Sequence, residues 1–307
     1  MIGTTQPLIS RLLARRTQPP LLLAAASTAA IDVAAYVGCA VALYWALARM
    51  AFRRQLAYRT ANLAGLVANG FFGYLRAAMF VATFASTPAG SIAGYDVQSA
   101  TTYVWVTQAL IMVLNLWGWW DVELTIRSGD VVSDLAKPFS YLGYWLARDY
   151  GRAAYFLLFR ALPSVVLGQL TVSSGLRWPG DQLTWLGLMA SVVLSIAVAF
   201  AWRFLLNLSA FWTTDARGLG ALANGVVLLL SGFVVPLRFL PDWIQPVILS
   251  LPFAAIIQLP CDIFVGRLHG AEVLHALLVQ AAWAVTLLAA AQVVVLLAMR
   301  RVSLQGG

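Results

Sequence analysis

Most of this chain consists of apolar runs that are long enough to cross a lipid bilayer. Residues 61–85 and 274–299 are two examples, and across the chain 61% of residues are hydrophobic while only 10% are charged. A soluble domain is nearer to half apolar and a quarter charged. Because about 20 apolar residues in a helix span the ~30 Å hydrocarbon core, the sequence predicts an all-α protein that crosses the membrane several times.

The segments between the apolar runs differ in charge. We predict six transmembrane helices, over residues 61–85, 101–119, 150–172, 183–202, 218–235 and 274–299. The connecting segments on one side hold twelve basic residues, namely Arg49, Arg53, Arg54, Arg59, Arg127, Lys137, Arg148, Arg152, Arg203, Arg217, Arg300 and Arg301. Those on the other side hold Arg177, Arg238 and Arg267. Because cytoplasmic loops are enriched in Lys and Arg, both flanks of the six-helix domain 61–301, and the tail 302–307, are predicted to be cytoplasmic.

The residues ahead of this domain have several interpretations. Residues 21–47 form an apolar run that is preceded by arginines. One interpretation is a signal peptide, with 46–48 as its A-x-A cleavage site, but the apolar core of a signal peptide spans only about 7–15 residues. A spanning helix is a second interpretation, to which the arginines at both ends give no orientation. Residues 44–60, rich in arginine, are predicted to form an elbow helix along the cytoplasmic interface. The role of the leader 1–43 is left open.

Residues 231–266 are apolar, yet they are not expected to form one spanning helix. This stretch holds Pro236, Pro241, Pro246, Pro252 and Pro260. An interior proline costs a helix about 3 kcal/mol, and irregular backbone at membrane depth occurs only where it packs in protein or lines a cavity. The charge count places the stretch outside, so we predict external re-entrant helices between the fifth and sixth helices. Its polar residues are predicted to lie at the rim: Arg238, Asp242, Gln245 and Asp262.

The longest polar stretch, 121–148, connects the second and third predicted helices. Ser128 is positioned to cap a short helix that Pro138 ends, with Asp130 near its positive end. The apolar residues of that helix are predicted to share one side: Val131, Val132 and Leu135. One interpretation is a solvated amphipathic connector, and the other is a docking helix that inserts into a groove on a soluble partner.

Three groups of residues form recognisable motifs. The polar stretch reads Glu123, Ile126-Arg127-Ser128-Gly129-Asp130, Asp134-Leu135-x-Lys137-Pro138, Gly151-Arg152 and Arg160-x-x-Pro163. The run before the first helix is Phe52-Arg53-Arg54-Gln55-Leu56-Ala57-Tyr58-Arg59, and the broken stretch contains Gly232-Phe233-x-x-Pro236, Leu240-Pro241 and Leu251-Pro252-Phe253. Together they resemble an ABC-2-type permease, the transmembrane subunit of a bacterial ABC exporter. The nearest resemblance is to a subgroup that works in pairs, and it covers roughly residues 46–301.

The resemblance implies a coupling helix that docks on a cytosolic ABC ATPase. The implied ATPase-coupling residues are Glu123, Arg127, Gly129, Asp130, Asp134, Lys137 and Pro138. The implied external gate includes Pro236, Pro241, Asp242, Pro252 and Phe253. It also implies a dimer with a second permease, the same or a related chain, in the bacterial plasma membrane. Because the chain has no G-x-x-x-x-G-K-[ST] phosphate loop, ATP and Mg are expected on the partner subunit, and this chain is not expected to be an enzyme or to bind a cofactor or metal.

Two arginines, Arg76 and Arg160, fall inside predicted helices. A central arginine costs about 2.5–3.5 kcal/mol on insertion scales, so such residues are rare and usually face a bundle interior. Snorkelling to the nearer interface is the alternative for each. We predict a role in the translocation path or in intramembrane pairing. The aromatic and aliphatic helices suit an amphipathic or lipid-like small molecule or drug as cargo.

Two other classes of protein compete with this interpretation. An ion-gradient-driven secondary transporter would bind substrate in broken helices at mid-membrane, but the broken pieces lie in one half of the chain and no buried carboxylate relay is evident. An intramembrane enzyme would need a catalytic constellation within one leaflet, and none is found. Glu272 lies between His269 and His275 at spacings that do not bring metal ligands together, so these three are predicted to form a juxtamembrane polar patch.

Overall fold

The computed structural model describes residues 21–88, 90–116, 119–213 and 217–305. The chain divides into two units, Met1–Ala46 and Leu47–Gly307, and each is described by itself. One helix, α2 (Leu21–Leu56), begins in the first unit and ends in the second. In the first unit, Val41 and Trp45 are exposed. The predicted elbow, 44–60, comprises the last part of α2, the turn at residues 57–58 and the first two residues of the next helix. Its place at a membrane surface stays a prediction.

Five helical segments of the second unit are long and apolar enough to span a membrane. They are α3 (Arg59–Ala85), α4 (Val97–Leu114), α7 (Tyr141–Phe156) continued through the π-helical η1 (Leu157–Ala161) into α8 (Leu162–Thr171), α9 (Gln182–Leu208) and α13 (Ala271–Gln305). The predicted second helix, 101–119, is wrong by about one turn, because α4 begins at Val97 and Asn115 adopts a left-handed conformation that ends it.

The predicted fifth helix, 218–235, is shorter than expected. Its counterpart, α10 (Arg217–Leu230), has 14 residues, which is ~21 Å of helix and less than the hydrocarbon core. The chain turns at Gly232, whose φ of 85° is left-handed and unfavourable for other residues. The six predicted spans therefore become five long helices and one short apolar helix among the described residues.

Helix α4 forms the centre of the second unit. Its spanning window is 83% buried, against 11% for that of α3, and it contacts α3, the α7–η1–α8 segment, α9 and α12 (Gln258–Phe264). Trp105 is 1% exposed and wedges between two glycines. A Cβ at Gly73 would lie 2.8 Å from the Trp105 ring, and one at Gly168 would lie 2.5 Å from it. These glycines let α3 and α8 approach α4 closely.

The proline-rich stretch folds into short pieces. They are the 3₁₀ turn η3 (Leu237–Phe239), α11 (Gln245–Ser250) and α12. A small antiparallel hairpin, β1 (Ser91–Ile92) with β2 (Tyr95–Asp96), precedes α4. Gln280 of α13 ties the stretch to the long helices, because its Nε2 donates to Ala255 O at 2.8 Å and to Ser195 Oγ at 2.9 Å.

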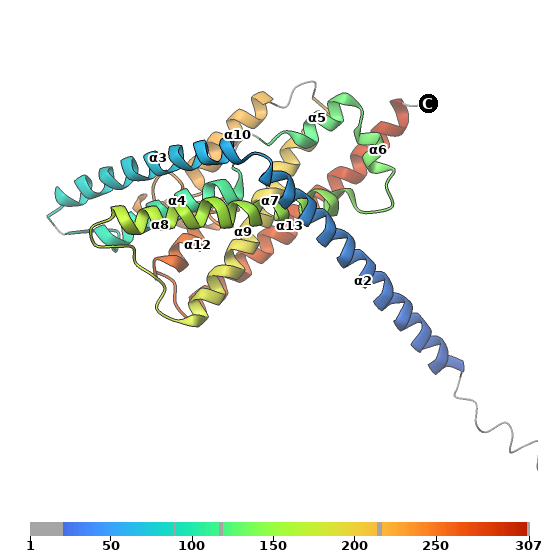
Figure 1. The fold of residues 1–307 in the computed structure, drawn as a ribbon, viewed down its shortest axis with the longest axis horizontal. Helices are drawn as coiled ribbons and strands as arrows, with labels where there is room; N and C mark the ends of the chain where they lie inside the picture. Colours follow the sequence, from blue (N-terminus) through green and yellow to red (C-terminus); the bar gives the residue numbers. More distant parts are fainter. Residues whose placement is uncertain (1–20, 89, 117–118, 214–216, 306–307) are drawn as a thin grey trace, which may run out of the picture. The chain divides into compact units, whose positions relative to one another are not determined.

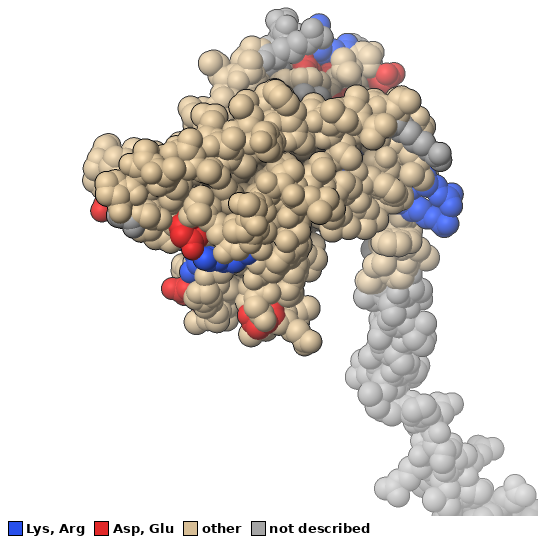
Figure 2. Space-filling view, turned by 60° about the vertical axis from the view of Figure 1, so that its left-hand side comes forward, with Lys and Arg blue, Asp and Glu red and all other residues tan. Residues whose placement is uncertain are grey.

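The second unit has two polar ends separated by an apolar middle. At one end Arg177 of the α8–α9 connection pairs with Asp96 at 2.7 Å, and Arg267 donates to Ala93 O. The other end carries the starts of α3 and α7, the C-terminal ends of α9 and α13, and two short helices, α5 (Asp121–Ser128) and α6 (Val131–Leu135) (Figure 1). Between these ends the visible surface is almost free of charge (Figure 2).

Candidate functional site

The polar loop between α4 and α7 folds into α5 and α6, joined by a tight turn. Gly129 ends α5 with a left-handed φ of 83°, and Ser128 Oγ donates to Asp130 Oδ2 at 2.7 Å. The prediction that Ser128 caps the short helix is wrong, because Ser128 is the last residue of α5. The helix ahead of Pro138 is only the five residues of α6, because Gly129 breaks what would otherwise be one longer helix.

The loop has one anchored face and one exposed face. Val131 is 3% exposed and packs in an apolar cluster with Tyr141 and Phe204, whereas Val132 is 54% exposed. The prediction that Val131 and Val132 share one side is therefore wrong, since adjacent helical residues lie about 100° apart. Leu124 is also 54% exposed.

Six of the seven predicted coupling residues lie wholly or partly at the surface of this loop. Arg127, Gly129, Asp130, Lys137 and Pro138 are exposed and Asp134 is half-buried. Lys137 Nζ donates to Asp134 Oδ1 at 2.6 Å, and this hydrogen bond raises the pKa of Lys137. The seventh residue, Glu123, is 1% exposed, and its nearest charged partner is Arg127 at 3.6 Å. Their role in coupling stays a prediction.

Asn207 of α9 fixes the start of α5. Its Oδ1 accepts from the Glu123 backbone N–H at 3.0 Å, and its Nδ2 donates to Trp119 O at 3.0 Å and to Arg203 O at 2.8 Å. The Arg203 guanidinium lies 5.2 Å from the centre of the Trp119 ring. The beginning of the loop is thus held by two consecutive turns of α9.

A buried ion cluster lies beneath this anchor. Asp149 of α7 accepts from Arg152 Nε through Oδ1 at 2.9 Å and from Arg203 Nη2 through Oδ2 at 2.8 Å. All three side chains are at least nine-tenths buried. Arg203 Nε and Nη1 have no partner among the described residues, and beside this arginine is a cavity of ≈ 10 Å³, about the space that one water needs.

Arg152 joins this cluster to α4. Its Nη1 donates to Met112 O at 3.1 Å and its Nη2 to Val113 O at 2.8 Å. The last carbonyls of a helix lack intrahelical partners and carry partial negative charge, so a buried arginine is well placed there. Through this cluster, α4, α7, α9 and the start of α5 form one connected structure.

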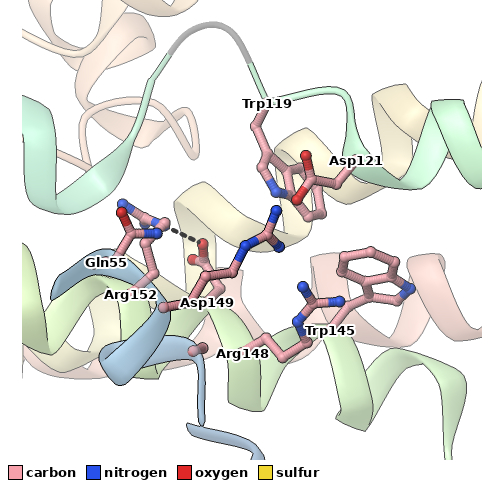
Figure 3. A pocket seen from close by; sticks show the side chains of 9 residues that line it. Gln55, Trp119, Asp121, Trp145, Arg148, Asp149 and Arg152 are labelled. Atoms are coloured by element: carbon pink, nitrogen blue, oxygen red, sulfur yellow. Dashed lines mark hydrogen bonds and ion pairs between the residues drawn. The ribbon is translucent and has the colours of Figure 1, made fainter. Parts of the chain in front are cut away.

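A small pocket of ≈ 50 Å³ opens beside the cluster. Trp119 and Asp121 reach it from the start of α5, Gln55 from the end of α2, and Arg148 and Arg152 from α7 (Figure 3). Arg148 stacks on aromatic rings, with its guanidinium 4.7 Å from the Trp145 centroid and 5.2 Å from that of Tyr144. The arrangement provides cation and hydrogen-bond donors but, among the described residues, no group of metal ligands.

Comparison with known families identifies the chain. The family model described as ABC-2 family transporter protein matches residues 72–306. The chain belongs to this family. It is therefore a multi-pass membrane protein and the transmembrane component of an ABC transporter, as the sequence motifs predicted. No curated protein matches the chain.

Both intramembrane arginines of this ABC-2 permease have partners in the protein. Arg160 is 5% exposed, lies in η1, and donates to Ala61 O at 3.2 Å; a Cβ at Gly65 would lie 2.2 Å from its Nη2. Arg76 donates to Thr107 Oγ1 at 3.2 Å and to the carbonyls of Phe233 and Val234. Each joins α3 to a neighbouring segment, and their part in translocation stays a prediction.

The predicted gate residues do not all lie at the surface. Pro241 and Asp242 are exposed, and Asp242 accepts from Gln245 Nε2 at 3.1 Å. Pro236, Pro252 and Phe253 are buried, and the Phe253 ring packs edge-on against Trp202 at 4.9 Å.

Asp262 contradicts its predicted place at the rim. It is fully buried, and its Oδ1 accepts from Tyr95 OH at 2.7 Å and from Gln258 Nε2 at 2.9 Å. Gln258 Oε1 in turn accepts from the Leu237 N–H at 2.8 Å and lies 2.8 Å from Tyr103 OH. This carboxylate is buried by neighbours that include residues far away in the sequence, so the local sequence pattern does not predict its burial.

Two aspartates, Asp149 and Asp262, are buried in the structure. The sequence had not indicated either of them as a buried carboxylate. The Asp149-x-x-Arg152 spacing, one acidic residue ahead of a basic one in an apolar helix, was the available signal. Arg203 and Asn207, four residues apart near the end of α9, gave a weaker one. Among the described residues His269, Glu272 and His275 belong to no metal-ligand group.

Proposed function

We propose that this permease moves an amphipathic or lipid-like small molecule outward, driven by ATP that a separate cytosolic ABC ATPase hydrolyses. The observation that carries the proposal is the α5–α6 loop. It exposes a surface made of Leu124, Val132 and charged residues, while its other face is anchored to α9 and the buried ion cluster. Exposed apolar residues rimmed by polar ones mark interaction sites.

The coupling mechanism follows from that anchoring. A push on the exposed face of α5 is carried to Glu123 and Asn207, and from there to Arg203, Asp149 and Arg152. Because these contacts join α4, α7 and α9, the three helices are expected to move with the loop. ATP and Mg bind the partner subunit in this proposal, and this chain performs no chemistry itself.

A second permease completes the pathway in this proposal. Helix α3 carries apolar side chains that are more than half exposed, among them Val67, Phe71 and Met79, and α10 carries Leu222 and Leu229. These surfaces suit lipid or a second permease, the same or a related chain. In this proposal the assembly lies in the bacterial plasma membrane. Both flanks of the helical domain would then be cytoplasmic, a proposal that the gathering of basic residues at the α5–α6 end supports.

The test is a pull-down with the cognate ATPase. Deletion of residues 128–137 is expected to abolish co-purification and ATPase stimulation, and the double variant Leu124→Asp, Val132→Asp is expected to do the same while leaving the buried anchor intact. Arg177→Gln, at the opposite end, is the matched control and should retain both. Intact coupling in the double variant would refute the docking assignment.

The alternative, an ion-gradient-driven secondary transporter, has one observation in its favour. Asp262 is a buried carboxylate within the broken stretch. Family membership favours the ABC assignment. Transport that survives ATP depletion but stops with an ionophore would establish the alternative.

A further inference from the structure

The pocket between the end of α2, the start of α5 and α7 carries a charge imbalance. The ionisable residues that line it are Arg54, Arg148, Arg152, Asp121 and Asp149. Three arginines against two aspartates leave a positive excess, and Arg203, which also pairs with Asp149, adds to it. Asp149 pairs with Arg152 and Arg203 and, in the described structure, with neither Arg54 nor Arg148.

Two of these arginines keep donors available. Arg54 is exposed and, in the part of the chain that the structure describes, its guanidinium makes no hydrogen bond or ion pair. Arg148 uses Nη1 for the Tyr144 hydroxyl at 2.9 Å, and its guanidinium is held by the rings of Tyr144 and Trp145. An arginine that is held flat against aromatic rings presents its remaining N–H groups in a fixed direction.

We propose that this pocket binds the phosphate group of an anionic phospholipid, with Arg54 and Arg148 as its ligands. Guanidinium groups match phosphate oxygens in geometry and form charge-assisted hydrogen bonds with them. A phosphate diester carries one negative charge, which is opposite in sign to the excess at the pocket. The ≈ 50 Å³ volume exceeds several times the 10–15 Å³ that one water requires, so it has room for an oxyanion.

The surroundings favour a lipid as the source of the phosphate. Leu158, Phe159 and Leu162, which follow Arg148 along the same continuous helix, are 49–54% exposed. Ten residues separate Arg148 from Leu158, or ~15 Å of helix, so acyl chains attached to the bound phosphate would lie along an apolar surface. The Phe52 ring of α2 contacts that of Phe159, which continues this surface to the same helix that supplies Arg54.

Such a ligand would join three segments of the permease. Arg54 belongs to the end of α2. Figure 3 shows Trp119 from the start of the α5–α6 loop and Arg148 from α7 at the same pocket. A bound phosphate would hold the end of α2 against α7 beside the anchor of the loop. Basic pockets between helices on the cytoplasmic side are known places for phospholipid headgroups.

The experiment measures lipid binding to the purified full-length protein in detergent. Phosphatidylglycerol is titrated and bound lipid is counted by native mass spectrometry, with phosphatidylcholine and inorganic phosphate as separate arms. We expect phosphatidylglycerol to bind at least about tenfold more tightly than phosphatidylcholine, and Arg54→Gln and Arg148→Gln each to weaken it by about tenfold, the loss of one charge-assisted hydrogen bond. Arg53→Gln, an exposed arginine one position away that does not line the pocket, should stay within about twofold of the unaltered protein.

Each alternative outcome is decisive. Equal weakening by Arg53→Gln would show diffuse electrostatic attraction and would overturn the site. Protection by inorganic phosphate with no response to lipid would assign the pocket to a soluble oxyanion and overturn the lipid. If Arg148→Gln failed to fold, Arg54→Gln alone would decide, because the Arg54 side chain is exposed and makes no hydrogen bond or ion pair in the described structure. Binding is measured without an ATPase or a cargo, so the outcome does not depend on the proposed transport function.

Discussion

At the scale of single residues, Asp149 determines whether two arginines can stay buried. It pairs with both Arg152 and Arg203, and Arg152 in turn binds the end of α4. Removing one partner of a buried ion pair costs about 3–5 kcal/mol, because the other charge remains without compensation. Because Asp149 pairs with two arginines, its removal would leave both of them without a negatively charged partner.

We therefore expect Asp149→Asn to lower the free energy of unfolding by about 3 kcal/mol or more. The midpoint of thermal unfolding in detergent, followed by tryptophan fluorescence, measures the change. Asp121→Asn is the matched control, because Asp121 lines the same pocket but is exposed and unpaired in the described structure. Equal midpoints for the Asp149 variant and the unaltered protein would show that the cluster does not hold the helices together.

A second prediction at this scale concerns the broken stretch. Tyr95→Phe removes the hydroxyl that donates to the buried Asp262 carboxylate at 2.7 Å, leaving Gln258 as the donor at Oδ1. Hydrogen bonds to charged groups contribute about 1.5–3 kcal/mol, so the unfolding midpoint should fall. Tyr74→Phe, at a tyrosine that is 59% exposed, should leave the midpoint unchanged. The prediction fails if the two variants unfold together.

At the residue level the sequence is informative where the signal is local. The insertion cost of an arginine in an apolar helix singled out Arg76 and Arg160, and in the structure each donates hydrogen bonds to other parts of the protein. Their role in pairing or in the translocation path stays a prediction. Asp262 had no such signal, because the tyrosine and glutamine that accompany it include a residue 167 positions away. Burial of this kind depends on tertiary contacts and not on local pattern.

At the scale of elements, one glycine allows the end of α2 to meet α7. A Cβ on Gly151 would lie 1.9 Å from the carbonyl oxygen of Ala48, which no real side chain tolerates. Gly225 of α10 has nothing within 4 Å of the same position. Both glycines lie inside helices, so they differ in what surrounds them and not in secondary structure.

Gly151→Ala and Gly225→Ala are therefore expected to change stability in opposite directions. The first forces α2 and α7 apart, at the 1–3 kcal/mol typical of overpacking. The second gains about 0.5–1 kcal/mol from reduced flexibility of the unfolded chain and better helix propensity. Thermal unfolding of both variants measures the difference, and a rise in the midpoint for Gly151→Ala would contradict the close approach.

The sequence predicted long helices better than short ones. Hydropathy located α3 to within two residues at each end, because its apolar run is long enough to span the bilayer. It found α9 and α13 but ended both six residues early, because the helices continue past the apolar run. It overextended α10, since residues 231–235 are as apolar as the helix before them and only the turn at Gly232 ends it. The capping signals predicted one short helix between Ser128 and Pro138, where α6 lies. They did not indicate α5, which ends at the left-handed Gly129.

At the scale of the whole molecule, the second unit is organised by its two charged ends. Arg177 with Asp96, and Arg267 with Ala93, join the loops of one end. Asp149 with its two arginines joins the helices of the other. Helix α4 connects them, and its 18 residues give ~27 Å, close to the ~30 Å hydrocarbon core. The distribution of charge therefore agrees with a membrane between the ends.

Sidedness is the last prediction. With Cys39, which is exposed, replaced by serine, the remaining Cys261 is fully buried and should not react. In that background a cysteine at Asp242 should react with a membrane-impermeant maleimide applied to intact cells, because Asp242 is exposed at the end predicted to be external. A cysteine at Asp130, exposed on the α5–α6 loop, should react only after the membrane is opened. The reverse labelling pattern would show that the protein has the opposite orientation in the membrane. The α5–α6 loop would then lie outside the cell, where a cytosolic ATPase could not bind it.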